Sequence, residues 1–365
     1  MRRLATALTA LFIAATAQAQ TLRTEVVAHG LVNPWSLAFL PDGRMLVTER
    51  PGRLRLVAAN GTLSAPIAGL PPVAAANQCG LLEVLPDPQF TANQRIYWSY
   101  AEPDRERRNG LAVARGTLKD GRLDDVQVIW RQSPKVSSSA HCGGKLAWGR
   151  DGRLFITTGD RFSEKDRAPK PDNTLGKVVR IEASGAIPAD NPLAKTPGAQ
   201  PEIWSMGHRN VQGAAIHPVS GALWVTEHGP QGGDELNISR AGANYGWPVI
   251  TYGRNYGLGT RIGEGTEAPG VTPPLRHWAP TSVAPSGLAF ITSPRYGKDW
   301  QGSLLVGTLR AQALLRLTLD GERVTGEERL LEDLHTRIRD VRQGPDGWVY
   351  LVTDAADGQI LRMVR

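Results

Sequence analysis

The chain has 365 residues and a formal net charge of +7, from 42 Lys and Arg against 35 Asp and Glu. The basic residues are scattered and form no run or nucleic-acid motif, which argues against nucleic acid as a partner. With 40 Gly, 26 Pro and 10 Trp, the composition is typical of a turn-rich β protein and not of a disordered chain.

The N-terminus resembles a secretory signal. Arg2 and Arg3 are followed by an apolar stretch over residues 4–17, which ends in the small-residue sequence Ala17-Gln18-Ala19. This stretch is too short and wrongly flanked for a membrane anchor, so we expect cleavage after Ala19. The rest of the chain contains no membrane-spanning run. The sequence therefore predicts a signal peptide at 1–19 and a single exported domain at 20–365, periplasmic or secreted.

One pattern repeats along the chain: an apolar run, a turn containing Gly or Asp, and a second β-rich run that often ends in Thr and an acid. The copies lie at 36–49, 81–100, 145–160, 213–227, 287–308 and 340–354. Each copy predicts a hairpin of two short apolar strands. Six such hairpins predict an all-β radial array, a β-propeller, whose loops gather around one central axis.

The chain has two cysteines, Cys79 and Cys142. In an exported protein such a pair favours a disulfide, although two unrelated buried residues remain the alternative. Cys79 follows Gln78 and Cys142 follows His141, so a disulfide would bring these two polar residues together.

Two polar clusters precede predicted hairpins. His141 lies before Gly143 and Gly144, and its near-neutral imidazole suits removal of a hydroxyl proton. Arg209 and Asn210 offer a fixed cation beside an amide, fit for a carboxylate or a developing oxyanion. The alternatives are a structural histidine and a salt bridge between blades.

The segment 227–237 (EHGPQGGDELN) combines oxygen-bearing side chains with Gly and Pro turns that expose carbonyls. Mixed carbonyl and carboxylate shells suit Ca²⁺, although the spacing is not that of an EF-hand. The alternative is an acidic surface loop.

Arg337 and Arg339 fall on the same face of an extended segment. Two like charges side by side favour a polyanionic ligand between them, whereas the alternative is a solvated face. Arg310 is a third candidate cation.

Taken together, these segments resemble the soluble glucose/sorbosone dehydrogenases that depend on pyrroloquinoline quinone (PQQ), in particular the aldose sugar dehydrogenases. The resemblance runs from about residue 31 to 365. Its motifs are GLVNPWSLAFLPDG (30–43), QCGLL (78–82), HCGG (141–144), GHRN (207–210), EHGPQGGDELN (227–237), ANYGWP (243–248) and RIRD (337–340). Their shared order implies a six-bladed β-propeller of four-stranded antiparallel blades.

The resemblance also implies one PQQ and two Ca²⁺ ions, one at the active site and one structural. It assigns His141 as the general base, with Gln78 and Arg209 near the reacting groups. It assigns Asn210, Arg337, Arg339, Arg310 and Trp278 to PQQ. It assigns the carbonyls of Gly229 and Pro230 to the first Ca²⁺, and Glu235 with the Tyr245 carbonyl to the second.

The implied reaction is oxidation of an aldose at C1 to a lactone, with electrons passed to an external acceptor. Arg310 stands where the glucose dehydrogenase branch has Lys, and the cysteines occupy variable motif positions. The loops that shape selectivity and dimerisation in that branch are reduced here, which favours a broad substrate range and a monomer. Two other functions stay open: a Ca²⁺-dependent propeller hydrolase such as a lactonase, and a non-catalytic binding propeller.

Overall fold

The computed structural model describes residues 22–365, and the predicted signal peptide lies outside this range. These residues form 23 β-strands, one short helix α1 (Phe90–Asn93) and three 3₁₀ turns, η1 (Lys165–Arg167), η2 (Pro294–Tyr296) and η3 (Glu332–Leu334). Within this range, no helix combines the length and the apolar character needed to cross a membrane.

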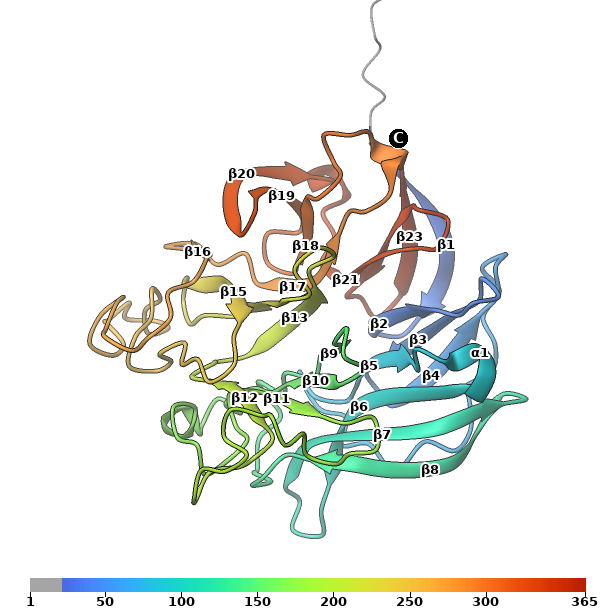
Figure 1. The fold of residues 1–365 in the computed structure, drawn as a ribbon. Coiled ribbons are helices and arrows are strands. Elements are labelled where there is room, and N and C mark those ends of the chain that lie inside the picture. Colours follow the sequence, from blue (N-terminus) through green and yellow to red (C-terminus); the bar gives the residue numbers. More distant parts are fainter. Residues whose placement is uncertain (1–21) are drawn as a thin grey trace, which may run out of the picture.

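The strands form six antiparallel sheets arranged as the blades of a propeller (Figure 1). The first blade comprises β2 (Pro34–Phe39), β3 (Met45–Glu49) and β4 (Arg53–Val57). The second comprises β5 (Leu81–Pro86), β6 (Arg95–Pro103), β7 (Asn109–Lys119) and β8 (Arg122–Arg131). The third comprises β9 (Leu146–Trp148), β10 (Leu154–Thr157), β11 (Lys177–Ile181) and β12 (Ile203–Met206).

The fourth blade comprises β13 (Val211–Ile216), β14 (Leu223–Glu227), β15 (Asp234–Ser239) and β16 (Arg276–Trp278). The fifth comprises β17 (Pro285–Phe290), β18 (Leu304–Thr308), β19 (Leu314–Asp320) and β20 (Arg323–Leu330). The sixth comprises β21 (Ile338–Gln343), β22 (Val349–Thr353), β23 (Gly358–Val364) and β1 (Arg23–Leu31).

This architecture confirms the predicted six-bladed propeller. Each predicted hairpin supplies the first two strands of one blade. The first strand of every blade contacts the first strands of its two neighbours, which closes the ring. In the first blade the segment 62–67 takes the position of a fourth strand, held by the antiparallel bridge between Val57 and Leu63 and by backbone hydrogen bonds of 2.8 Å from Ser64 N to the Leu56 carbonyl and from Ile67 N to the Leu54 carbonyl. The ring is closed where β1 pairs with β23, so the two ends of the described chain share one blade.

The core lies between the blades because each sheet is apolar on both faces. Leu46 of the first blade and Trp98 of the second are fully buried in one cluster. The axis is instead crossed by a buried ionic group: Lys145 Nζ lies 2.9 Å from Glu83 Oε2 and 2.8 Å from Asp340 Oδ1. These contacts join β5 and β21, the first strands of two blades, to the residue that precedes β9, the first strand of a third blade.

Candidate active site

The predicted site residues gather at one end of the propeller. Gln78, His141 and Arg209 each lie just before the first strand of a blade, and Arg337 and Arg339 lie at the start of β21. Gly229 follows β14, the second strand of its blade. In an antiparallel hairpin, the start of the first strand and the end of the second lie at the same edge. These loops therefore meet at the same end of the propeller.

His141 is paired with a buried acid. Its Nδ1 lies 2.6 Å from Asp160 Oδ1, and Asp160 Oδ2 accepts a hydrogen bond of 2.7 Å from Trp247 Nε1. Burial lowers the pKa of His141 below its ordinary value, the hydrogen bond to Asp160 opposes this, and the charge of Arg209 adds to the lowering. The lowered pKa favours the neutral imidazole, Asp160 orients it, and Nε2 has no hydrogen-bond partner among residues 22–365, which is the state that a general base requires.

The loop that carries His141 is fixed to the loop that carries Gln78. Gln78 Oε1 accepts a hydrogen bond of 2.8 Å from the His141 backbone N–H. Cys79 and Cys142 form a disulfide with a Cα–Cα distance of 5.7 Å, which confirms the predicted pairing. Both cysteines are buried. The disulfide therefore stands directly beside the base.

A cavity of about 320 Å³ lies at the same end of the propeller. Its lining residues are Arg50, Asn77, Gln78, Gln212, His228, Ala284, Leu309, Arg337, Arg339 and Asp354. Asp354 Oδ2 accepts from Arg337 Nη2 at 2.9 Å and from Arg339 Nη2 at 3.0 Å, while Arg50 Nη1 lies 3.8 Å from Oδ1. Three guanidinium groups thus share one carboxylate, and the cavity keeps a positive excess.

The cations are held in place by burial and by further hydrogen bonds. Burial works against ionisation of Asp354, but Arg339 and Arg337 hold its pKa below the ordinary value. Arg339 also donates to Gln212 Oε1 at 3.0 Å, yet its buried Nε has no partner among the described residues. A carboxylate bound in the cavity would give this buried donor a partner.

His228 lies against the same cavity as a neutral group. Its Nε2 donates a hydrogen bond of 2.8 Å to the Pro285 carbonyl. Burial and the charges of Arg339 and Arg209 lower the pKa of His228 to about 3. His228 therefore adds no positive charge to the cavity at neutral pH.

Arg209 connects the base to the predicted calcium loop. Its guanidinium donates to the carbonyls of His228 and Gly229, and it lies 5.3 Å from the ring of Trp247. Its backbone N–H donates to Glu227 Oε2 at 2.7 Å. The carbonyl of Gly229 thus accepts a hydrogen bond from a cation, the guanidinium of Arg209.

Asn210 is buried, and its Oδ1 accepts from Gly143 N and from Gln212 Nε2, both at 3.2 Å. It therefore joins the His141 loop to Gln212, which lines the cationic cavity.

A smaller cavity of about 190 Å³ opens above His141. Asp160, Arg209, Pro230 and Trp247 share its lining with Phe162, Lys165, Asn255, Tyr256 and Ile262. The ring of Phe162 meets that of His141 edge-on at 5.2 Å, and its side chain is 58% exposed. An exposed aromatic face beside a base can stack on a small organic ligand.

The residues predicted for a second cation also come together. Glu235 and Tyr245 line a space of about 10 Å³ with Glu227 and Gly229. Glu227 and Glu235 are directly opposite each other on β14 and β15. Burial raises the pKa of Glu235 well above its ordinary value, and the charge of Glu227 adds to this. Within residues 22–365 no group of three His, Cys, Asp or Glu side chains forms a metal site, so a cation here would also need backbone carbonyls.

Two predicted cofactor residues do not reach the cavities. Trp278 is buried in the core between the fourth and fifth blades and donates to Glu327 Oε2 at 3.0 Å. The Arg310 side chain is exposed, and the neighbouring Leu309 lines the cationic cavity in its place. The assignment of Trp278 and Arg310 to PQQ stays a prediction.

Asp160, Asp354, Arg50, Gln212 and His228 were not predicted. The repeated hairpin pattern carried a signal for two of them, because its copies end in an acid. Asp160 and Asp354 are such terminal acids, and each holds a basic residue from the start of a blade. Glu227 does the same for His208, whose Nδ1 is 2.8 Å away.

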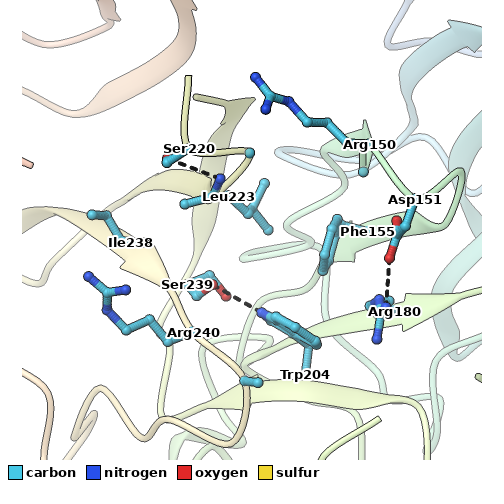
Figure 2. Close-up of a pocket in the computed structure, with 14 residues that line it drawn as sticks. Arg150, Asp151, Phe155, Arg180, Trp204, Ser220, Leu223, Ile238, Ser239 and Arg240 are labelled. Atoms are coloured by element: carbon cyan, nitrogen blue, oxygen red, sulfur yellow. Dashed lines mark hydrogen bonds and ion pairs between the residues drawn. The ribbon is translucent and has the colours of Figure 1, made fainter. Parts of the chain in front are cut away.

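A further cavity of about 440 Å³ lies between the third and fourth blades (Figure 2). It is bounded by the turns at 149–151 and 220–222, which follow the first strands, so it lies at the opposite end from His141. Figure 2 shows Phe155, Trp204 and Arg180 on its wall, with Arg180 bonded to Asp151. It contains none of the predicted site residues.

The fold and the site together define a class: a six-bladed propeller with a cationic cavity beside a buried His–Asp pair. The sequence model of the Glucose / Sorbosone dehydrogenase family matches residues 31–362, and the chain belongs to this family. This confirms the predicted family and its dehydrogenase class.

The relatives agree over nearly the whole chain. Aldose sugar dehydrogenase YliI of Escherichia coli is 43% identical over 348 residues, which is 94% of this chain and 93% of that protein. The crystal structure of a glucose dehydrogenase is 50% identical, with a TM-score of 0.91 over 94% of this chain and 99% of that one. The PQQ-bound aldose sugar dehydrogenase of Streptomyces coelicolor is 26% identical, with a TM-score of 0.77 over 94% and 98%.

Proposed function

We propose that this chain is a PQQ-dependent aldose sugar dehydrogenase of the periplasm or the cell exterior. It oxidises aldoses at C1 to lactones and passes the electrons to an external acceptor. The observation that carries the proposal is the cationic cavity, where Arg50, Arg337 and Arg339 face a single carboxylate. The PQQ-bound relative supports the identity of the ligand.

The cavity fits PQQ in charge and size. PQQ carries three carboxylates, and guanidinium groups form charge-assisted hydrogen bonds with such groups. The unpartnered Nε of Arg339 is one donor that a carboxylate would satisfy. The volume of about 320 Å³ lies at the lower end of the range of about 300–1,000 Å³ for ligand sites. Asn210 would support this cavity through its bond to Gln212.

Bound PQQ would supply the hydride acceptor for the sugar, and Ca²⁺ would supply Lewis-acid polarisation of a quinone carbonyl. His141 takes the proton of the C1 hydroxyl on Nε2, since Nδ1 is committed to Asp160. Asp160 stabilises the imidazolium that forms and keeps the ring oriented. Arg209 places a positive charge beside the reacting atoms, and Gln78 holds the His141 backbone.

The calcium assignments rest on the oxygen donors of the loop after β14. The carbonyls of Gly229 and Pro230 would hold the catalytic Ca²⁺, with Arg209 now bonded to the first of them. The carboxylate of Glu235 and the carbonyl of Tyr245 would hold the second, beside Glu227. A cation there would remove the repulsion between the two glutamates.

The proposal is tested by dye reduction with the mature protein, PQQ and Ca²⁺ across a panel of aldoses, followed by mass spectrometry of the product. We expect the lactone. The same protein is offered lactones as substrates: hydrolysis without dye reduction would indicate the Ca²⁺-dependent hydrolase. Neither reaction, with no PQQ bound, would indicate a binding propeller.

A further inference from the structure

Arg161 directly follows Asp160 and is fully buried. Its guanidinium bonds to the first residue of β7 and to the loop between β8 and β9 that carries His141: Nη2 donates to Asn109 Oδ1 at 2.6 Å and to the Ser138 carbonyl, and Nη1 lies 3.4 Å from Gln132 Oε1. Nη2 also lies 3.7 Å from Cys79 Sγ, one half of the disulfide beside the base. One side chain thus joins the His141 loop to β7 and to the disulfide.

The backbone of Arg161 adds two more contacts with that loop. Its N–H donates to the His141 carbonyl at 3.3 Å, and its carbonyl accepts from Ser138 Oγ at 2.7 Å. Arg161 has φ 59° and His141 has φ 47°, both in the left-handed region that such residues rarely adopt. Strained residues of this kind persist only where the surroundings over-determine them, and they cluster at functional sites.

The charge of Arg161 is unusual as well. All of its hydrogen bonds within residues 22–365 go to neutral groups, and its buried Nε has no partner. Burial lowers the pKa of Arg161 to about 10, so the side chain stays charged at neutral pH. A buried cation without a paired carboxylate is costly, and it is retained where its charge has a use.

The positive charge of Arg161 acts on the imidazole of His141. Arg161 lowers the pKa of His141, although burial, Asp160 and Arg209 act more strongly. The other ionisable groups near the base are His228, from the loop after β14, Lys165, from the loop after β10, and Tyr256, from the loop after β15. Among the described ionisable residues near the base, Arg161 is joined to the His141 loop by both backbone and side-chain hydrogen bonds.

We propose that Arg161 is a positioning residue for the sugar oxidation, which fixes the His141 loop against the disulfide and favours the neutral, proton-accepting imidazole. The inference rests on the proposed function. The Arg161 side chain would contribute in two ways, through the forked geometry of the guanidinium and through its positive charge. Lys keeps the charge and loses the fork, whereas Met loses both.

The experiment compares Arg161→Lys and Arg161→Met in the full mature protein loaded with PQQ and Ca²⁺. We expect kcat to fall about 10- to 100-fold in both variants, with little change in KM, because a small displacement of the base is enough for such a loss. The acidic limb of the kcat/KM profile should move to higher pH in Arg161→Met and stay in place in Arg161→Lys. NMR titration of the His141 imidazole in the protein without PQQ should show the same difference.

Arg180 supplies the control. It is also buried, with 5% of its surface exposed, and its Nε is also unpartnered among the described residues, but it pairs with Asp151 at the far cavity (Figure 2). Arg180→Lys should alter thermal stability without moving kcat or the pH profile. Wild-type kcat in Arg161→Lys would overturn the positioning role, even if Arg161→Met fails to fold. An unshifted His141 titration in folded Arg161→Met would overturn the role of the charge. Because that titration needs no turnover, it decides the inference separately from the proposed function.

Discussion

Asp160→Asn changes the group that orients the base. In the wild type, Oδ1 accepts from His141 Nδ1 at 2.6 Å and from Phe162 N at 2.8 Å, and Oδ2 accepts from Trp247 Nε1 at 2.7 Å. An amide offers one oxygen and one NH₂ group, so it cannot accept from both rings. If Trp247 keeps its acceptor, the NH₂ group faces His141 Nδ1 and the proton moves to Nε2. That tautomer cannot take a proton from the sugar.

The size of the effect follows from the lost interaction. A hydrogen bond to a charged group contributes about 1.5–3 kcal/mol. With 1.36 kcal/mol for each tenfold change in rate, kcat should fall about 10- to 150-fold. The affinity for PQQ should not change, because Asp160 does not line the cationic cavity.

The assay is dye reduction by the reconstituted enzyme at saturating sugar, with PQQ binding measured by titration. Asp151→Asn is the matched control, since Asp151 also pairs with a basic residue but at the far cavity. Turnover of Asp160→Asn within twofold of the wild type would refute the view that this carboxylate sets the tautomer of His141.

Four further predictions follow from the same structure. His141→Ala should keep PQQ binding and lose about 10²–10⁴-fold in kcat, as expected for removal of a general base; near wild-type turnover would exclude this role. Arg339→Met should weaken PQQ binding by about 10- to 150-fold in a titration, from the loss of charge-assisted hydrogen bonds, and an unchanged affinity would argue against the cavity as the PQQ site. Ca²⁺ should raise the melting temperature of the wild type, and Glu235→Gln should reduce that increase; equal increases would place the ion elsewhere. Burial lowers the pKa of Lys177 to about 7 from 10.5, so the unfolded chain binds the additional proton between these values and the free energy of unfolding rises with pH across this window. Lys177→Met should flatten that rise in denaturant titrations, and an unchanged slope would show that Lys177 is not its cause.

The fold was largely predictable because the hairpin pattern is local. The run 145–160, for example, contains its own turn at Asp151-Gly152 and became β9 and β10. The closure of the ring was not predictable in this way, since β1 and β23 come from opposite ends of the chain. Pairing between strands so far apart in the sequence produces no pattern within either segment.

The site was predictable where backbone position decides it. His141 and Gln78 come together because both precede first strands, and the disulfide holds them. Arg310 and Trp278 were predicted from their place in a motif, but the direction of a side chain depends on packing. In the structure Trp278 packs into the core and Arg50 lines the cationic cavity, so the assignment of Trp278 and Arg310 to PQQ stays a prediction.

The most direct test of the central claim is titration of the purified mature protein with PQQ, with and without Ca²⁺, followed by aldose-dependent dye reduction. The cationic cavity and the His141–Asp160 pair predict saturable binding of PQQ and turnover that requires both additions. Absence of PQQ binding under both conditions would contradict the assignment of the cavity, and with it the proposed dehydrogenase activity.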